Sequence, residues 1–200
     1  MPIISMDLPV YKLQIDASQD SELQVDYVAL VDKPAIEKDF IAFNESKPLQ
    51  FLVNEDRNII SGAAMLADVP IYRRDEQMGE YFVVFDAPTI FQIVEKFFSK
   101  GFNQNFNLMH DPAAKLSGVT VFESFIVDKS RGIQPMVGFE DAKDGSWFMS
   151  AKVNNPEVWQ MIKNGTVKGF SVEGIFSYKK SPMSADQTLA KIMELLNDTN

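Results

Sequence analysis

Alternating apolar and polar residues dominate this chain, and such a period of two predicts more strands than helices. The segments with this pattern are 11–15, 27–31, 49–53, 81–85, 106–110, 119–127, 147–153 and 168–176. The strands are interleaved unevenly with helical segments. The sequence therefore predicts an α+β fold, with a mostly antiparallel sheet or a partly closed β-barrel and peripheral helices.

Helical periodicity with start and stop signals marks three segments. They are 87–101, 154–165 and 184–196. The first carries one apolar stripe and stops at Gly101. The second has Asn155 as N-cap and Pro156 at its first position. The third begins with Ser184 and Gln187, the spacing of a capping box, and is amphipathic. We therefore expect three helices.

The length and apolar content bound the domain count. A chain of 200 residues with 46% hydrophobic content can bury one core, so a single domain is expected. The polar stretch 178–184 has the composition of a linker before the last helix. We place the domain at 1–180, of which 1–25 could be extended, and a linker with a C-terminal amphipathic helix at 181–200.

Composition excludes several kinds of site. The chain has 19 basic and 28 acidic residues, a net charge of −9, and no basic patch, which disfavours nucleic acid. It has no cysteine and a single histidine, so thiolate nucleophiles, disulfides and the common zinc sites are excluded. The acidic cluster in 139–148 lacks the ligand spacing of a calcium loop. No run approaches the length of a membrane span. We expect a soluble, unsecreted protein without cofactor or metal.

Ser171 lies within the sequence VKGFSVEGIF, which departs from the GxSxG nucleophile motif of α/β-hydrolases. Gly169, Ser171 and Gly174 have the spacing GxSxxG, and no helical pattern follows. Alternation places Ser171 and Glu173 on one face of a strand and Phe170 on the other. Ser171 is therefore either a nucleophile or a small structural residue.

A serine nucleophile needs a general base within hydrogen-bond reach, and His110 is the only histidine. It is expected at the end of a strand, just before a turn formed by Asp111 and Pro112. Asp111 is expected to cap this turn. His110 is either the base or an ordinary, partly buried side chain.

The third member of such a site must accept a hydrogen bond from the imidazole. Glu123 interrupts an apolar run, where a buried charge would need a partner, and it is our candidate. Alternatively, Glu123 lies on the solvent face of its strand. Asp128 and Glu173 are further candidates.

Several ordered blocks resemble one known family. They are YVALVDKPAI, GAAMLADVPIYR, NFNLMHD, VFESFIVD and DGSWFMSAKVNNPEVWQMIKNGTVKGFSVEG, within residues 26–176. They are similar to the phage prohead maturation proteases, in particular the XkdF-like phage serine proteases, whose wider superfamily is related to herpesvirus assemblin. His110, the helix that ends at Gly165 and Ser171 fall on positions of the family pattern. The resemblance implies an assemblin-like or prohead-protease-like fold with Ser171 and His110 as catalytic residues. Assemblins use a second histidine, which is missing here, so Glu123 is our substitute.

The resemblance also implies a biological role. It implies a procapsid maturation endopeptidase that cleaves scaffold protein and major capsid protein, with self-cleavage, as a homo-oligomer inside the procapsid in the host cytoplasm. No nucleic acid or membrane partner is implied. The substrate is expected to bind as an added strand, with Gly169 and Gly174 allowing its close approach. The segment after Tyr178 is a candidate for docking onto scaffold or for removal.

Two other functions stay open at this point. The chain could be a non-catalytic assembly or scaffold-associated protein that keeps a protease-like fold. It could also be an esterase, which would have a deep apolar pocket beside Ser171, whereas a peptidase would have an open groove.

Overall fold

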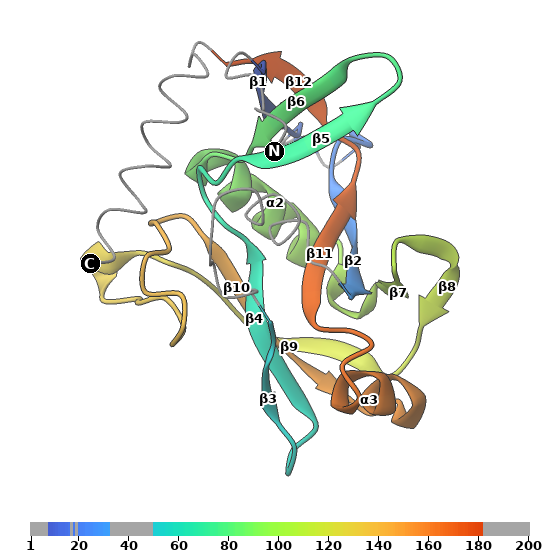
Figure 1. Cartoon of the computed structure of the whole chain (residues 1–200). Helices are drawn as coiled ribbons and strands as arrows, with labels where there is room; N and C mark the ends of the chain where they lie inside the picture. Colours follow the sequence, from blue (N-terminus) through green and yellow to red (C-terminus); the bar gives the residue numbers. More distant parts are fainter. Residues whose placement is uncertain (1–7, 17, 19, 33–49, 182–200) are drawn as a thin grey trace, which may run out of the picture.

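The computed structural model describes residues 8–16, 18, 20–32 and 50–181 of the chain (Figure 1). Within these ranges the strands form three four-stranded sheets, none of which closes into a barrel. The first has the order β12 (Ser177–Lys180), β1 (Val10–Gln14), β6 (Gly79–Val84), β5 (Ile71–Asp75). The second has the order β3 (Leu52–Asn54), β4 (Ile59–Met65), β10 (Trp147–Val153), β9 (Val119–Ile126). The third has the order β11 (Gly169–Gly174), β2 (Val25–Val31), β7 (Phe106–Leu108), β8 (Asp111–Leu116).

Most strand pairs are antiparallel, as the sequence predicts. Only β1–β6 and β2–β7 are parallel among the described pairs. The same residues contain the helices α2 (Ala87–Ser99) and α3 (Pro156–Lys163) and the 3₁₀ turns η2 (Phe102–Gln104) and η3 (Lys129–Arg131). The α+β prediction is confirmed, whereas the alternative of a partly closed barrel is not.

The core forms around one face of α2, which Figure 1 shows in the middle of the molecule. Ile90, Ile93 and Phe97 on this face are fully buried among residues from all three sheets. The ring of Phe97 meets that of Trp147 in β10 edge to face, with centroids 5.5 Å apart. The apolar stripe read from the sequence is thus the contact that joins the sheets.

Both described helices end where their sequences predict. In α3 the side-chain oxygen of Asn155 accepts from the backbone N–H groups of Glu157 and Val158, at 3.0 and 3.2 Å. Gly165 follows the helix with φ of 73°, and Gly101 follows α2 with the same value. Neither helix is long and apolar enough to cross a membrane, and the described residues contain no other candidate.

Four strands were missed in the sequence: β4, β5, β8 and β12. In β4 the small residues Ser61, Gly62 and Ala63 weaken the apolar alternation. In β5 the arginine pair is exposed because this strand is at the edge of its sheet. The stretch 178–180, expected to belong to a linker, is part of β12 and pairs with β1. The Ser181 N–H continues this pairing by donating to the carbonyl oxygen of Val10 at 2.8 Å. Residues 182–184 of that linker and the helix at 184–196 lie outside the described residues.

A buried lysine fixes the segment that leads into β2. The Lys96 side chain of α2 is only 2% exposed. Its Nζ donates to the carbonyl oxygens of Asp16, Ser18 and Ser21 at 3.0, 2.7 and 2.8 Å. Burial lowers the pKa of Lys96. These bonds hold the chain before β2 against α2, and β2 is the strand between the two halves of the site described below.

We expect Lys96→Met to lower the free energy of unfolding by about 3 kcal/mol, because the carbonyl oxygens of Asp16, Ser18 and Ser21 lose a charged donor. Urea unfolding followed by tryptophan fluorescence measures this difference. Lys163→Met, at an exposed position of α3, is the control and should unfold like the wild type. Equal stability of the two variants would contradict this role of Lys96.

Candidate active site

Ser171 and Glu173 lie on the same face of β11, two residues apart as strand alternation requires. Ser171 is directly opposite Ala29 of β2, and Glu173 is opposite Tyr27. Ser171 is 7% exposed. Figure 1 shows β11 beside β2, with the β7–β8 hairpin on the far side of β2.

His110 is in the two-residue turn between β7 and β8. Met109 and His110 both have positive φ, 53° and 60°. Two-residue hairpins of the type that requires this conformation at both positions usually contain asparagine and glycine. The expected strand end at His110 is therefore wrong: the turn is formed by Met109 and His110, and Asp111 already belongs to β8. Asp111 accepts from the backbone N–H of Ala113 at 2.8 Å, a local contact like the cap expected for it.

Two hydrogen bonds attach this turn to the end of β2. The Met109 N–H donates to the carbonyl oxygen of Leu30 at 3.1 Å. The Asp32 N–H donates to the Met109 sulfur at 3.3 Å. Since β2 also pairs with β11, the turn is held at a fixed place relative to Ser171. Left-handed backbone at a non-glycine residue costs free energy, and such strain is concentrated at functional sites.

The imidazole of His110 lies between a hydroxyl and a carboxylate. His110 Nε2 is 3.0 Å from Ser171 Oγ, and His110 Nδ1 is 3.2 Å from Glu173 Oε2. The His110 side chain is 42% exposed and that of Glu173 is 30% exposed, so the site is open to solvent. Ser171 and His110, paired in the sequence analysis, are therefore in direct contact. The arrangement is that of a nucleophile, a base and a group that orients the base.

Glu173 occupies the place that we expected for Glu123. Glu123 is exposed in β9 of the second sheet, opposite Ser150, and no described contact joins it to His110. Its charge interrupts the apolar run because it faces solvent, the alternative left open above. Asp128, the other candidate, bonds to Ser130 and Arg131. The signal that could have identified Glu173 was its shared strand face with Ser171.

Asn107 is a polar residue of this site that the sequence did not single out. It is 1% exposed, and its Nδ2 donates to Glu173 Oε2 at 2.7 Å. Its Oδ1 is buried and has no partner among the described residues. Ala29, directly between Ser171 and Asn107 in the sheet, has only a methyl side chain. The small side chain of Ala29 leaves room for the His110 imidazole. The hydrogen bond from Asn107 holds the Glu173 carboxylate in place.

Two further charged residues, Asp26 and Lys115, lie near Glu173 and Tyr27. Burial raises the pKa of Asp26, and the charge of Glu173 raises it further. A hydrogen bond to Tyr27 raises the pKa of Lys115, whose Nζ is 5.3 Å from the centre of the Tyr27 ring. The Lys115 ammonium is therefore also close to the Asp26 carboxyl group.

We expected the substrate backbone to come close to Gly174, but the close contact at this residue is with another part of the same chain. A Cβ built on Gly174 would lie 2.0 Å from the backbone oxygen of Gln24, so a side chain there would disrupt the contact with the chain at the start of β2. The absence of a side chain at Gly174 is thus required by β2 packing.

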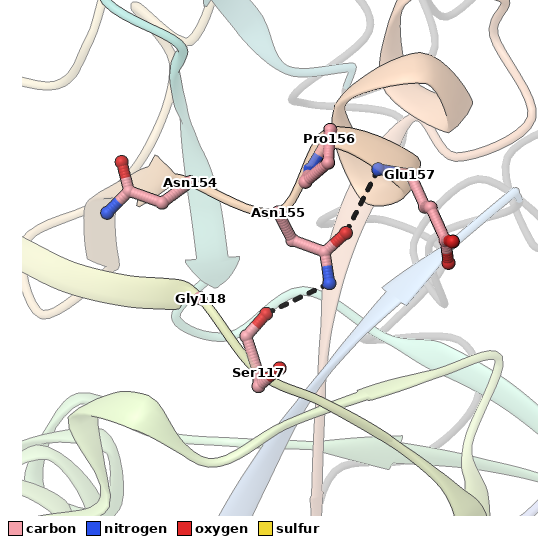
Figure 2. Close-up of a pocket in the computed structure, with 6 residues that line it drawn as sticks. All are labelled: Ser117, Gly118, Asn154, Asn155, Pro156 and Glu157. Carbon is pink, nitrogen blue, oxygen red and sulfur yellow. Dashed lines mark hydrogen bonds between the residues drawn. The ribbon is translucent and has the colours of Figure 1, made fainter.

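The described residues contain no group of three or more His, Cys, Asp or Glu side chains that could hold a metal ion. A polar hollow of about 400 Å³ lies at the start of α3 (Figure 2). Its lining residues are Ser117, Gly118, Asn154, Asn155, Pro156 and Glu157. Figure 2 shows the Asn155 amide joining the Ser117 carbonyl oxygen and the Glu157 N–H. The hollow does not include Ser171, His110 or Glu173.

A comparison with known families gives a match over most of this fold. The family described as "Putative phage serine protease XkdF" matches residues 50–179, more than half of the chain. The chain belongs to this family. No curated protein and no solved structure matches this chain. His110, Ser171 and Glu173 all lie within the matched residues of this XkdF-family protein. The relation to herpesvirus assemblin stays a prediction.

Backbone strain at His110 of this XkdF-family chain can be measured by comparing two variants that both lack the imidazole. His110→Gly should be more stable than His110→Ala by about 1 kcal/mol, because only glycine adopts positive φ without steric cost. Urea unfolding of both variants gives the difference directly. An alanine variant at least as stable as the glycine variant would show that the turn is not strained.

Proposed function

We propose that this chain is a phage procapsid maturation endopeptidase that cleaves scaffold and capsid proteins by serine acyl transfer. The observation that carries the proposal is the position of His110, with Nε2 at 3.0 Å from Ser171 Oγ and Nδ1 at 3.2 Å from Glu173 Oε2. Membership of a phage serine protease family supports the reaction class. The substrates, and the place of action inside the procapsid in the host cytoplasm, rest on the resemblance to prohead proteases.

Glu173 sets the form in which His110 can act as a base. A carboxylate next to Nδ1 accepts a hydrogen bond, which favours the proton on Nδ1 and leaves the lone pair of Nε2 directed at Ser171. The same carboxylate stabilises the imidazolium once Nε2 gains a proton. Asn107 keeps Glu173 Oε2 in place through the 2.7 Å bond from its amide.

The proposed reaction takes place in two halves. His110 Nε2 removes the Ser171 proton while Oγ attacks the carbonyl carbon of the substrate, and the carbonyl oxygen becomes an oxyanion. The intermediate collapses, the C–N bond breaks, and His110 gives the proton to the leaving amine. A water molecule, deprotonated by His110, then attacks the acyl-enzyme and releases the acid, and the proton returns to Ser171 Oγ.

The partners that we propose for this chain are proteins. A net charge of −9 disfavours a polyanionic partner such as nucleic acid. Scaffold protein and major capsid protein would be the substrates, with self-cleavage and homo-oligomer formation as further proposals. The exposed placement of His110 fits a protein substrate.

Two glutamate variants test which carboxylate orients His110. We expect Glu173→Gln to lower the rate of scaffold cleavage by about 10²–10⁴-fold, because the amide no longer favours the required tautomer or stabilises the imidazolium. Glu123→Gln is the matched control and should keep wild-type activity. Cleavage of purified cognate scaffold, followed by gel electrophoresis at fixed enzyme concentration, measures both rates. Full activity of Glu173→Gln would contradict the role of Glu173.

Ser171→Ala in the same assay separates the endopeptidase from a non-catalytic assembly protein. The endopeptidase predicts cleavage by the wild type and none by this variant. Equal patterns for both proteins, with or without cleavage, would favour the assembly role.

A further inference from the structure

The outer edge of β11 is the part of the site whose backbone groups have no assigned role. Among the described strands, β11 pairs only with β2, so it is an edge strand of the third sheet. A peptide can add to such an edge through backbone hydrogen bonds. Acyl transfer also requires an N–H donor for the oxyanion beside the nucleophile. Both requirements point to the backbone next to Ser171.

The bonds on the other side of β2 show which of its residues turn toward β11. The Val28 N–H donates to the carbonyl oxygen of Asn105 at 3.0 Å. The carbonyl oxygen of Leu30 accepts from Met109 N–H at 3.1 Å. Val28 and Leu30 therefore direct their backbone groups toward β7. Ala29, which lies between them, directs its groups toward β11.

The alternating direction of the backbone groups along β2 determines which way the backbone groups around Ser171 point. Ala29 is directly opposite Ser171 in an antiparallel pair. Facing residues of this kind exchange both backbone hydrogen bonds. Ser171 is thus bonded to β2, and its neighbours Phe170 and Val172 direct their N–H and C=O groups to the outer edge.

Part of the edge is already occupied. The carbonyl oxygen of Lys168 accepts from Phe51 N–H at 2.7 Å, so the chain entering β3 lies beside the start of β11. Beyond this contact, no described group bonds to the outward N–H groups of Phe170 and Val172. Among the described residues, the unbonded part of this edge therefore begins next to the nucleophile.

We propose that the Val172 N–H is an oxyanion donor and that an extended segment of a protein substrate binds along the outer edge of β11 as an additional strand. This inference rests on the proposed function. Because Val172 directly follows Ser171, a carbonyl carbon within reach of Ser171 Oγ can place its oxygen at the Val172 N–H. The ladder bonds of Ser171 and Glu173 to β2 hold this N–H in a fixed direction, so it needs little reorganisation during the reaction.

The donor acts at one point of the proposed chemistry. When Oγ forms its bond to the carbonyl carbon, the π electrons move to oxygen and the Val172 N–H binds the resulting negative charge. When the C–N bond breaks, the electrons return to the carbonyl and the proton on His110 goes to the amine. The N–H is neither consumed nor transferred.

Replacing the Val172 peptide bond by an ester removes this N–H without changing the side chain. The α-hydroxy analogue of valine, 2-hydroxy-3-methylbutanoic acid, introduced at position 172 by nonsense suppression, gives this variant. We expect kcat for scaffold cleavage to fall about 10²–10³-fold, with little change in KM, because the bond is strongest to the oxyanion. Val172→Ala keeps the N–H, so any loss of kcat in this variant should be much smaller than the loss in the Val172 ester.

Two further variants complete the test. An ester at Phe170 removes the other outward N–H, which lies away from the oxyanion, so it should raise KM and leave kcat unchanged. Val172→Pro also lacks the N–H, and an outward position on an edge strand tolerates proline. It should show the same loss of kcat as the Val172 ester.

The outcomes separate this inference from the proposed function. Wild-type kcat in a folded Val172 ester, together with an inactive Ser171→Ala, would overturn the donor role and leave the serine protease proposal intact. If the ester fails to fold, judged by circular dichroism, Val172→Pro decides, and a wild-type kcat in that folded variant would overturn the donor role. A wild-type chain that leaves purified cognate scaffold uncleaved would overturn both the donor role and the proposed function.

Discussion

The hydrogen bond between His110 and Ser171 is the interaction on which the site depends. It joins residues sixty-one positions apart in the chain, and it forms only because β2 lies between their strands. β11 pairs with one edge of β2, and the turn that carries His110 is bonded to its end through Met109. Any loss of register in β2 would move the base away from the nucleophile, since a shift of one residue reverses every side chain.

The strained turn and the buried polar side chain of the site are better explained by function than by stability. His110 keeps a positive φ of 60° in a turn where glycine would be cheaper. Asn107 keeps an amide in the core with one oxygen unpaired among the described residues. Both features cost stability, and both act on the same imidazole and carboxylate. Lys96, by comparison, is bonded to the carbonyl groups of Asp16, Ser18, Ser21 and Leu23, and its burial serves the fold.

Much of the scaffold could be predicted from local pattern. The strand at 147–153, the caps of α3 and the buried stripe of α2 follow from alternation, Asn155 and helical periodicity. These signals are short-range, so a single sequence contains them. The residues alone left the roles of Ser171 and His110 open, and the resemblance to the phage proteases favoured their pairing.

The rest depended on contacts that no local pattern encodes. Alternation places Glu173 on the strand face of Ser171, but only the pairing of β11 and β7 with β2 brings His110 to that face and not to Glu123. Met109 and His110 lack the residues that normally mark a two-residue turn, so its position was misjudged by two residues. β12 was read as linker because its partner, β1, is at the opposite end of the chain.

Reaction with a fluorophosphonate tests the central claim without a known substrate, because such a reagent reacts much faster with a serine whose proton is removed by a neighbouring base than with an ordinary serine. Intact-mass spectrometry and peptide mapping should show one adduct per chain, located on Ser171, and no adduct in His110→Ala. An unmodified wild-type chain, or equal labelling of Ser171 in the His110 variant, would contradict the account.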